Sequence, residues 1–591
     1  MTTNSSAGHI TRTDAAQGRG SRYLKIRRGG RLFAASAFLV VCWRAAEISP
    51  SALFDWRACV SMWAFIQSLF PPDLSPGFLT VVLAALGQTV AIAAASTLLS
   101  VTFGLLLGVL ATGTLWRRGI LLAGESASVS AFLLAGASRA ARALLSFLRA
   151  VPDLIWAVMF VVAVGLGPLA GMLALSVSYT GVMGRVYADV FEDVDSRPLE
   201  ALQSTGATRA QIFLRGIWPQ AASLITAYTL YSFECCVRAA TVLGFVGAGG
   251  IGYEINLSMR LFDYGQVLTL MLALVALLAA IDAFSRRVRL RIREGAFAGK
   301  LYKKPKFLRV PLRSRPLPTN RAEAYGITAV AVVVAAWSFY SIGITQGALF
   351  EAGLAGRVVR FIGGMFPPDL DPAFLKSLAV PLIQTIGISV MGTIIGIAIG
   401  AALALPATST LVFVERDKAG KDSFIERALR RFIYYPARLA LNVLRSIPEL
   451  VWVLICILAV GLGAFAGTLA IGLHTGGVLG KLYAETLEEA PARPIEALRA
   501  SGARPLQLLI WGIIPQVRPL LVSYTVLRWE ANLRISTILG LVGGGGLGQA
   551  LYNKVQLGFY PQVATIIAII YMLVIATEWL GERWRERMAA I

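Results

Sequence analysis

Two pairs of oppositely charged residues stand inside long apolar stretches of this chain. Glu234 and Arg238 lie four residues apart, and so do Glu530 and Arg534. A charge at the centre of a membrane helix costs about 2.5–3.5 kcal/mol on insertion scales, so these side chains should face a protein interior or a cavity. Two interpretations stay open. Each pair could be an i,i+4 ion pair that holds a helix bundle together, or Arg238 and Arg534 could help an anion across a membrane.

A second set of charges raises the same question beside prolines. A proline interrupts a membrane helix and frees backbone groups, so these charges could serve structure, gating or contact with a solute. The residues concerned are Arg149 and Asp153 around Pro152, and Arg445 and Glu449 around Pro448.

The residue types that most enzymes use are scarce. The sequence has two histidines, His9 and His474, and five cysteines whose spacing fits neither a metal site nor a disulfide framework. We therefore predict no metal site and no catalytic residue, which argues against a membrane-bound enzyme. His474 is expected to pack in a bundle or line a pathway.

Composition defines the class of protein that must position these charges. The 591 residues are 56% hydrophobic and only 15% charged, with a mean hydropathy of +0.68. Soluble proteins carry about 25% charged residues. Long apolar runs of membrane-spanning length predict an all-α integral membrane protein; they lie near 82–112, 151–177, 219–250, 265–285, 325–342, 376–406, 447–473, 519–548 and 563–579.

The sequence contains an internal repeat, in which one unit occurs twice. Residues 70–74 (FPPDL) return as 366–370, at an offset of 296 (366 − 70), and the same offset relates 149–156 (RAVPDLIW) to 445–452 (RSIPELVW). We expect about twelve transmembrane helices in two six-helix repeats. Both repeats would have the same orientation, related by an axis along the membrane normal, with a pathway between them.

Charge predicts the orientation of the repeats. The net charge is +22, and residues 286–322 hold 13 Lys and Arg against one acid, while residues 1–31 hold seven against one. Cytoplasmic segments of membrane proteins are rich in Lys and Arg. We predict a cytoplasmic tail (1–31), a first repeat (32–285), a cytoplasmic linker (286–322) and a second repeat (323–591), with no nucleic-acid partner.

A matched polar segment follows the fourth predicted span of each repeat. An acid, an alanine, a later glycine and a proline recur as Glu200, Ala201, Gly206 and Pro219, and as Glu496, Ala497, Gly502 and Pro515. The pattern predicts a short amphipathic helix with an acid near its N-terminus, a sharp turn at glycine, and a proline that opens the next helix. Such a projection suits docking into a groove of another protein.

This segment resembles the EAA loop of ABC-importer permeases. The copies depart from it at Leu202 and Leu498, where that loop has alanine, and at Gly216 and Gly512, where it prefers isoleucine. The runs 445–452, 477–483 (GVLGKLY) and 528–530 (RWE) are similar to permeases of the phosphonate/phosphate type. The first repeat is the more divergent copy, with Cys235-Cys236 where the second has Ala531-Asn532.

The resemblance implies a type I importer core, with two permease units fused in one chain. It further implies a bacterial inner-membrane location, two cytoplasmic ABC ATPases and a periplasmic substrate-binding protein. ATP would be bound by the partners, since this chain has no phosphate-binding G-x-x-x-x-G-K-[ST] loop. The solute would be a phosphonate-like or phosphate-like oxyanion. A methionine-type importer and a six-plus-six secondary transporter are the alternatives.

Two glycine-rich stretches match the dinucleotide-binding pattern. A true site of that kind needs a soluble strand–turn–helix unit, whereas these glycines end apolar runs. We interpret them as a flexible extracytoplasmic bend near a gate; they are Gly247, Gly249 and Gly252, and Gly543, Gly545 and Gly548.

Overall fold

The computed structural model is built from helices throughout the part of the chain that it describes. That part comprises residues 33–49 without Ala35, 60, 63–64, 67–113, 129–296, 333–343, 354–412, 424–540 and 543–589. The predicted tail (1–31) and most of the linker lie outside it. The linker's first residues belong to the last helix of the first half, which runs to Ala296.

The first half folds into helices of very different lengths. In order they are α4 (Pro76–Ala111), α6 (Val129–Ala150), α7 (Asp153–Val164), α8 (Pro168–Glu192), α9 (Ser196–Ser204), α10 (Arg209–Ile212), the π-helical turn η1 (Phe213–Ile217), α11 (Trp218–Gly244), α12 (Ile251–Arg260) and α13 (Tyr264–Ala296).

The second half repeats this order. Its helices are α15 (Leu354–Gly364), α16 (Pro372–Ser377), α17 (Ala379–Ala407), α18 (Ser409–Val412), α19 (Phe424–Ser446), α20 (Glu449–Val460), α21 (Ala464–Glu488), α22 (Ala492–Ala500), α23 (Pro505–Gln507), the π-helical turn η4 (Leu508–Ile513), α24 (Ile514–Leu539), α25 (Gly546–Gln556) and α26 (Tyr560–Ala589). Helices α7, α8, α9, α11 and α13 each start 296 residues before their counterparts, as the sequence repeat requires.

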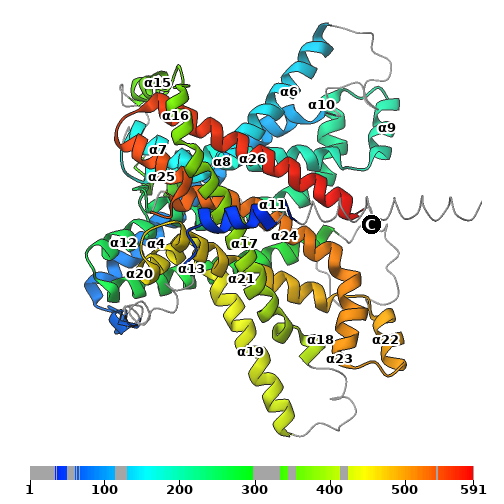
Figure 1. The fold of residues 1–591 in the computed structure, drawn as a ribbon. Helices are drawn as coiled ribbons and strands as arrows, with labels where there is room; N and C mark the ends of the chain where they lie inside the picture. The colour runs from blue at the N-terminus through cyan, green and yellow to red at the C-terminus, as the bar shows by residue number, and fades with distance from the viewer. Residues whose placement is uncertain are drawn as a thin grey trace, which may run out of the picture.

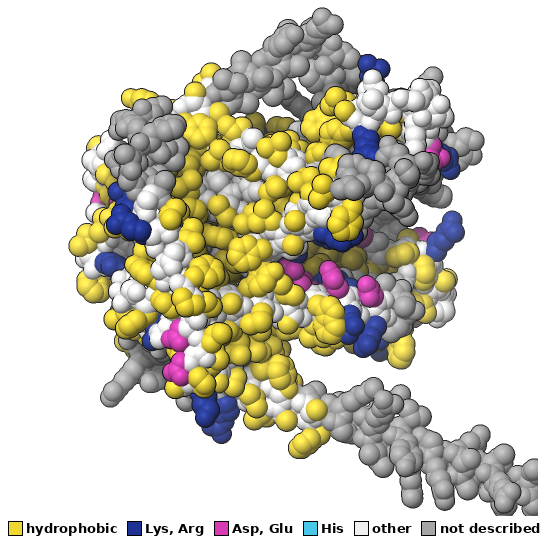
Figure 2. Space-filling model, turned by 90° about the horizontal axis from the view of Figure 1, so that it is seen from above, with side chains coloured by type: hydrophobic (Ala, Val, Ile, Leu, Met, Phe, Trp, Pro, Cys, Tyr) yellow, Lys and Arg dark blue, Asp and Glu magenta, His cyan; other side chains and the backbone are white. Residues whose placement is uncertain are grey.

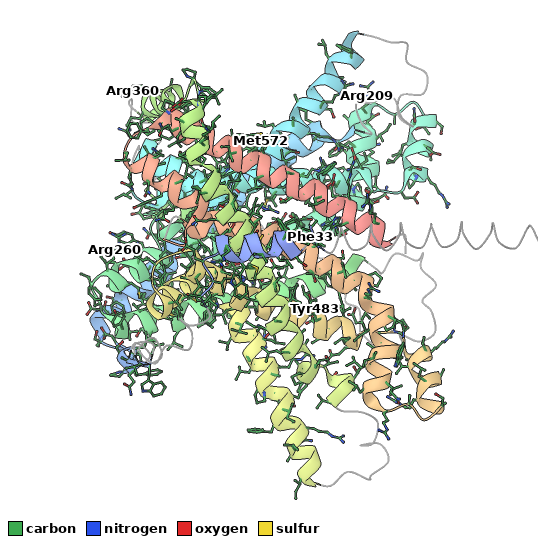
Figure 3. All side chains as sticks on the ribbon, viewed as in Figure 1. Phe33, Arg209, Arg260, Arg360, Tyr483 and Met572 are labelled. Atoms are coloured by element: carbon green, nitrogen blue, oxygen red, sulfur yellow. The ribbon has the colours of Figure 1, made fainter. Side chains whose placement is uncertain are left out.

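Six described helices are long and apolar enough to cross a membrane, which gives up to eight spans if each of two sharply bent helix pairs forms one more. The count of twelve stays a prediction. Figure 2 shows hydrophobic side chains over most of the described surface on one face. In Figure 3, exposed Phe33 and Met572 lie between Arg209 at one end of the molecule and Arg260 and Arg360 at the other.

The bent pairs form where the sequence places Pro152 and Pro448. Helices α6 and α7 meet at 88°, and α19 and α20 at 94°. A proline has no N–H, so the carbonyl four residues earlier loses its helical partner. The Trp156 indole donates to Leu148 O (3.4 Å) and the Trp452 indole to Leu444 O (3.1 Å). The tryptophans of the repeated motif therefore occupy the carbonyls that the prolines free.

Two of the predicted apolar runs are each divided between two helices. Run 151–177 turns at Gly165 and Gly167, and run 447–473 turns at Gly461 and Gly463. All four glycines have positive φ, from 89° to 141°, which side chains with a Cβ rarely adopt.

Small residues let the long helices of each half approach closely. Gly396 and Gly400 of α17 face Thr475, Gly476 and Gly480 of α21, a spacing typical of tightly packed membrane helices. In the first half Ser96 and Ser100 of α4 donate to backbone carbonyls of α8.

The two halves exchange their first helices. Cys42 and Ala46, at the end of the apolar helix Ser36–Ala45, pack against Met391 of α17 in the second half. In return, Ile342 packs against Ala91 and Ala95 of α4 in the first half. Each half thus holds the other through an element that lies distant in sequence.

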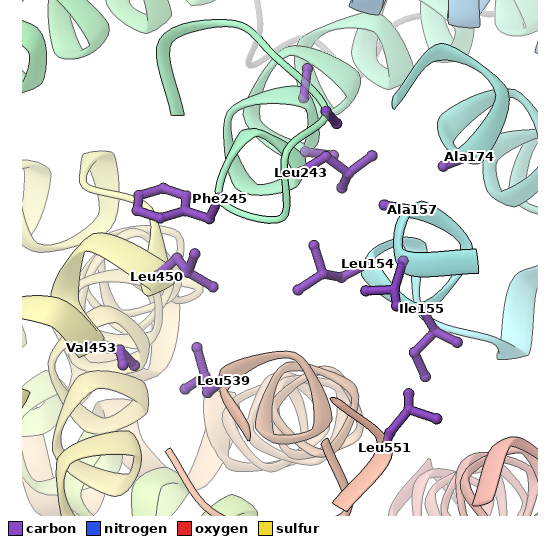
Figure 4. Close-up of a cluster of buried hydrophobic side chains, with 14 of the residues drawn as sticks. Leu154, Ile155, Ala157, Ala174, Leu243, Phe245, Leu450, Val453, Leu539 and Leu551 are labelled. Atoms are coloured by element: carbon purple, nitrogen blue, oxygen red, sulfur yellow. The ribbon is translucent and has the colours of Figure 1, made fainter. Parts of the chain in front are cut away.

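A continuous apolar core joins the halves between α7, α11, α20 and α24. Leu154 and Leu243 come from the first half, and Leu450 and Leu539 from the second; all are almost fully buried. Figure 4 shows these side chains arranged around a common centre. At the ends of the bundle, α9, α22, α23 and the end of α26 lie on one side, and α12, α15, α16 and α25 on the other (Figure 1).

Candidate functional site

The projecting helices α9 and α22 carry the repeated acid–alanine pairs. Glu200 and Ala201, like Glu496 and Ala497, are exposed. The expectation that the acids sit at the helix N-terminus is wrong, since each is the fifth residue of a nine-residue helix. The N-cap of α9 is Asp195, whose carboxylate accepts from Arg197 N at 3.1 Å. The exposed acids are thus free of a capping role.

A glycine turn follows each of these helices. Gly206 has φ +77° and Gly502 has φ +83°, a conformation that favours glycine. Each turn leads through a short helix and a π-helical turn into α11 or α24. Pro219 and Pro515 stand at the second position of those helices, where a missing N–H is tolerated.

The departures from the EAA pattern compensate one another. A Cβ added to Gly216 would lie 3.1 Å from Leu202 Cδ1 and 2.6 Å from Leu199 Cδ2, and one added to Gly512 would lie 3.1 Å from Leu498 Cδ1. The larger leucine at the third position of the loop therefore fills the space that the smaller glycine leaves. This exchange of volume preserves the packing of the loop on the π-helical turn.

A duplicated ion pair, not among the residues predicted from the sequence, lies just before each projecting helix. Arg142 pairs with Glu192, which also accepts from Gly113 N. In the second half Arg438 Nη2 lies 2.5 Å from Glu488 Oε1, and Glu488 accepts from Ser409 N at 2.6 Å. The sequence repeat could have predicted these ion pairs, because both members of each pair recur at the repeat offset.

Each of these arginines also caps a helix end. Arg142 Nε donates to Ala111 O at 2.7 Å, and Arg438 Nε to Ala407 O at 2.8 Å. Both carbonyls end a long helix and lack a helical partner. The ion pairs therefore tie α4, α6 and α8, and likewise α17, α19 and α21, together beside the projecting loops. We call each of them a helix-end clamp.

The charges expected to line a pathway form pairs that differ between the halves. Arg238 Nη2 donates to Glu234 at 3.0 Å, the i,i+4 pair of the sequence analysis. In the second half that pairing is wrong. Glu530 binds Arg585 of α26 instead, and Arg534 lies 3.7 Å from Glu578 of α26. Helix α26 supplies closer charged partners than the next turn of α24 does.

Arg149 also differs from the expectation. Its Nη2 donates to Glu578 Oε2 at 2.8 Å, across the boundary between the halves, in place of the expected Asp153. Arg445, its counterpart, lies at the end of α19. Its expected partner Glu449 binds His474 and Arg528 in place of Arg445.

The second half contains a partly buried polar cluster around Arg528. Arg528 Nη2 lies 2.7 Å from His474 Nδ1 and 3.3 Å from Glu449 Oε1, and His474 Nδ1 lies 3.0 Å from the same carboxylate oxygen. Thr475 lies beside it and donates to Asn532 at 3.0 Å. His474 was expected to pack or line a pathway; Arg528 was missed as a candidate.

The expected gate-region glycines form tight hairpins. Gly247 and Gly249, like Gly543 and Gly545, have positive φ. A Cβ on Gly252 would lie 1.8 Å from Thr241 O, and one on Gly548 would lie 1.9 Å from Thr537 O. These glycines hold α12 against α11, and α25 against α24, with no space for a side chain.

The repeated Gln-Thr pair of α4 and α17 caps the short helix after each hairpin. Thr89 accepts from Ile251 N at 2.8 Å, and Gln88 from Gly250 N at 2.6 Å. Thr385 accepts in the same way from Leu547 N at 2.9 Å. The hairpins are thereby bonded to the long scaffold helices.

The repeated FPPDL segment contacts the start of the last helix of each half. Thr269 donates to Asp73 O at 2.8 Å, and Thr565 to Asp369 O at 2.6 Å. The backbone N–H of Ser75 lowers the pKa of the Asp73 carboxyl, and that of Asp371 lowers the pKa of Asp369.

Two repeated helical halves, duplicated projecting loops and charges between the halves indicate a membrane transport permease. Residues 119–294 and 423–583 match the family described as binding-protein-dependent transport system inner membrane component, and the chain belongs to this family.

Named relatives are similar to the whole chain or to part of it. The phosphate-import permease protein PhnE of Mycolicibacterium smegmatis is 31% identical over 552 residues, 93% of each chain. The phosphite transport system permease protein PtxC of Stutzerimonas stutzeri is 35% identical over 41% of this chain and 80% of its own. A structure of the MetNI methionine ABC transporter covers 37% of this chain and 99% of its own, at 23% identity and TM-score 0.31.

Proposed function

We propose that this chain forms the whole membrane pathway of an ATP-driven importer for a small phosphorus oxyanion. The observation that carries this proposal is the similarity to phosphate and phosphite permeases on a chain with two docking loops. The doubled length supports the fused arrangement, because one permease of the PtxC type corresponds to 41% of the chain.

The partners follow from the two loops. Two copies of a cytoplasmic ABC ATPase would bind α9 and α22, which project from the same end of the molecule (Figure 1). A periplasmic binding protein would deliver the anion at the opposite end. This chain would bind no cofactor, and ATP would be hydrolysed in the ATPases. The N-terminus and the linker would be cytoplasmic.

Loop function is tested by changing both copies together. Glu200→Ala with Glu496→Ala, or Gly206→Ala with Gly502→Ala, should abolish ATP-dependent uptake while the protein still inserts into the membrane. Glu586→Ala is the matched control, since Glu586 is exposed on the same side but outside the loops. Unchanged uptake in both double variants would contradict the coupling role.

The substrate is tested in proteoliposomes that contain the full complex and its binding protein. Phosphate, phosphite and methylphosphonate should compete for uptake, and D-methionine should not. Uptake of D-methionine would favour the methionine-type alternative, which rests on 28% identity to a probable D-methionine permease over 31% of this chain. The family membership leaves no observation in favour of a six-plus-six secondary transporter.

A further inference from the structure

The two halves differ in chemistry at the polar cluster around Arg528. Because the repeat offset is fixed, each member has a matched position in the first half. Arg528, His474 and Asn532 correspond to Ser232, Ser178 and Cys236. The second half thus has a guanidinium, an imidazole and an amide where the first has two hydroxyls and a thiol.

The cluster lies where the halves meet. Tyr231 and Arg238 of the first half lie within electrostatic range of Arg528, and Asp153 of the first half lies within that range of Glu449. The Arg528 and Glu449 side chains keep 16% and 24% of their exposure. They are therefore within reach of a solute that passes between the halves.

The guanidinium of Arg528 suits a tetrahedral oxyanion. The planar guanidinium of arginine matches two oxygens of a phosphate-type group. The hydroxyl of Thr475 lies beside it at 3.4 Å from Nε, and His474 Nδ1 lies 2.7 Å from Nη2. Thr475 is fixed in turn by Asn532, which donates to Thr393 of α17 at 2.9 Å.

In this conformation the carboxylate of Glu449 is the partner of the Arg528 guanidinium. A carboxylate resembles the anion it would exchange with, so Glu449 can act as a resident counter-ion that the solute displaces and that afterwards returns. A transport site must bind strongly enough to admit the solute and weakly enough to release it. Competition from Glu449 would set that balance.

We propose that Arg528 binds the oxyanion in transit, at a single site built by the second half alone, with Glu449 as its displaceable counter-ion. This inference rests on the proposed function. It assigns one anion site to a chain with two permease units. It gives Arg528 a role that Arg238 does not have, because the carboxylate partner of Arg238, Glu234, lies on the same helix.

The test compares uptake with ATP hydrolysis in proteoliposomes that hold the full complex, its binding protein and labelled phosphate or phosphite. Arg528→Ser installs the residue of the matched position. It should lower uptake about 10- to 100-fold, the range for loss of a charged hydrogen bond. ATP hydrolysis stimulated by the binding protein should stay within about threefold, so more ATP is used per anion. Ser232→Ala, the matched control, should change uptake less than about twofold.

Two further variants keep the test decisive if Arg528→Ser does not fold. Arg528→Lys retains the charge without the planar fork and should lower uptake while ATP hydrolysis persists. Glu449→Gln frees the guanidinium and should cost less uptake than either arginine variant. Parallel loss of uptake and ATP hydrolysis in Arg528→Lys and Glu449→Gln would overturn the site and leave a purely structural cluster.

Failure of the inference is distinct from failure of the proposed function. If the unmodified complex imports no phosphorus oxyanion, the proposed function is wrong. If it imports one and Arg528→Ser imports it equally well, only the anion site is wrong. Equal losses in Arg528→Ser and Ser232→Ala would overturn the one-sided arrangement.

Discussion

Arg149 of the first half donates a 2.8 Å hydrogen bond to Glu578 of the second half. Glu578 also lies 3.7 Å from Arg534, so one carboxylate serves two arginines at the boundary between the repeats. These side chains are only partly exposed, and bulk water screens the contact weakly.

We expect Glu578→Gln to weaken the contact between the halves, because two arginines lose their shared counter-charge. The stability loss should be about 1.5–3 kcal/mol, the value of a hydrogen bond to a charged group, and is measured by thermal unfolding of the purified protein in detergent. Glu582→Gln is the control, since Glu582 is exposed one turn further along α26. Equal melting temperatures for the two variants would contradict the role of the pair.

The hairpin glycines should be intolerant of a methyl group. In Gly252→Ala the new Cβ would lie 1.8 Å from Thr241 O, so α12 must move away from α11. The cost should reach the upper end of the usual overpacking range, about 3 kcal/mol. Thermal unfolding and the yield of extracted protein measure it.

Gly77→Ala is the matched control for that prediction. Nothing lies within 4 Å of a Cβ at Gly77, and alanine favours a helix over glycine by roughly 0.5–1 kcal/mol. The two substitutions should therefore change stability in opposite directions. A similar loss in both would show that α11 and α12 are not packed as described.

The volume exchange between Leu498 and Gly512 in the second projecting loop predicts a double-mutant result. Gly512→Ile places isoleucine against Leu498 and should impair the loop, whereas Leu498→Ala makes room for it. The double variant should recover stability and binding-protein-stimulated ATP hydrolysis relative to Gly512→Ile alone, with a coupling of about 1 kcal/mol. Strictly additive effects would mean that the two positions compensate only by coincidence.

Exchanging the two charged residues of the first helix-end clamp, Arg142 and Glu192, should disrupt it. Arg142→Ala leaves Glu192 without its cation, and we expect weaker ATP-coupled uptake with a stability loss of about 1.5–3 kcal/mol. Combining Arg142→Glu with Glu192→Arg should fail to restore either. An arginine cannot accept from Gly113 N, and a glutamate cannot donate to Ala111 O.

Arg142→Lys is the conservative variant for this site. It keeps the charge and one donor, so it should recover part of the uptake that Arg142→Ala loses. Full rescue by the exchanged pair, measured in the same uptake assay, would show that simple charge attraction holds the clamp.

Local patterns predicted several features correctly. The breaks at Pro152 and Pro448 follow from the missing N–H of proline, and the turns at Gly206 and Gly502 from the conformational freedom of glycine. The pair Glu234–Arg238 matches one of the two interpretations that the helical spacing left open. Each of these outcomes depends on residues within one or two helical turns.

Contacts between distant segments could not be predicted in the same way. Glu530 and Arg534 have the same i,i+4 spacing as Glu234 and Arg238, yet α26 offers Arg585 and Glu578 at closer range. The repeat predicts equivalent positions, but an ion pair forms with whichever opposite charge the packing brings nearest.

By itself, the sequence determined the helical membrane class, the twofold repeat and the positions of the breaks and turns, because hydropathy, offset, proline and glycine act locally. Only the tertiary structure decided that the first helices exchange, that Arg149 reaches Glu578, and that Arg528 gathers Glu449 and His474 from two other helices. These contacts join residues that are 54 to 429 positions apart or lie in opposite halves. The packing of the helices determines which residues become partners, and no short-range sequence pattern predicts those partners.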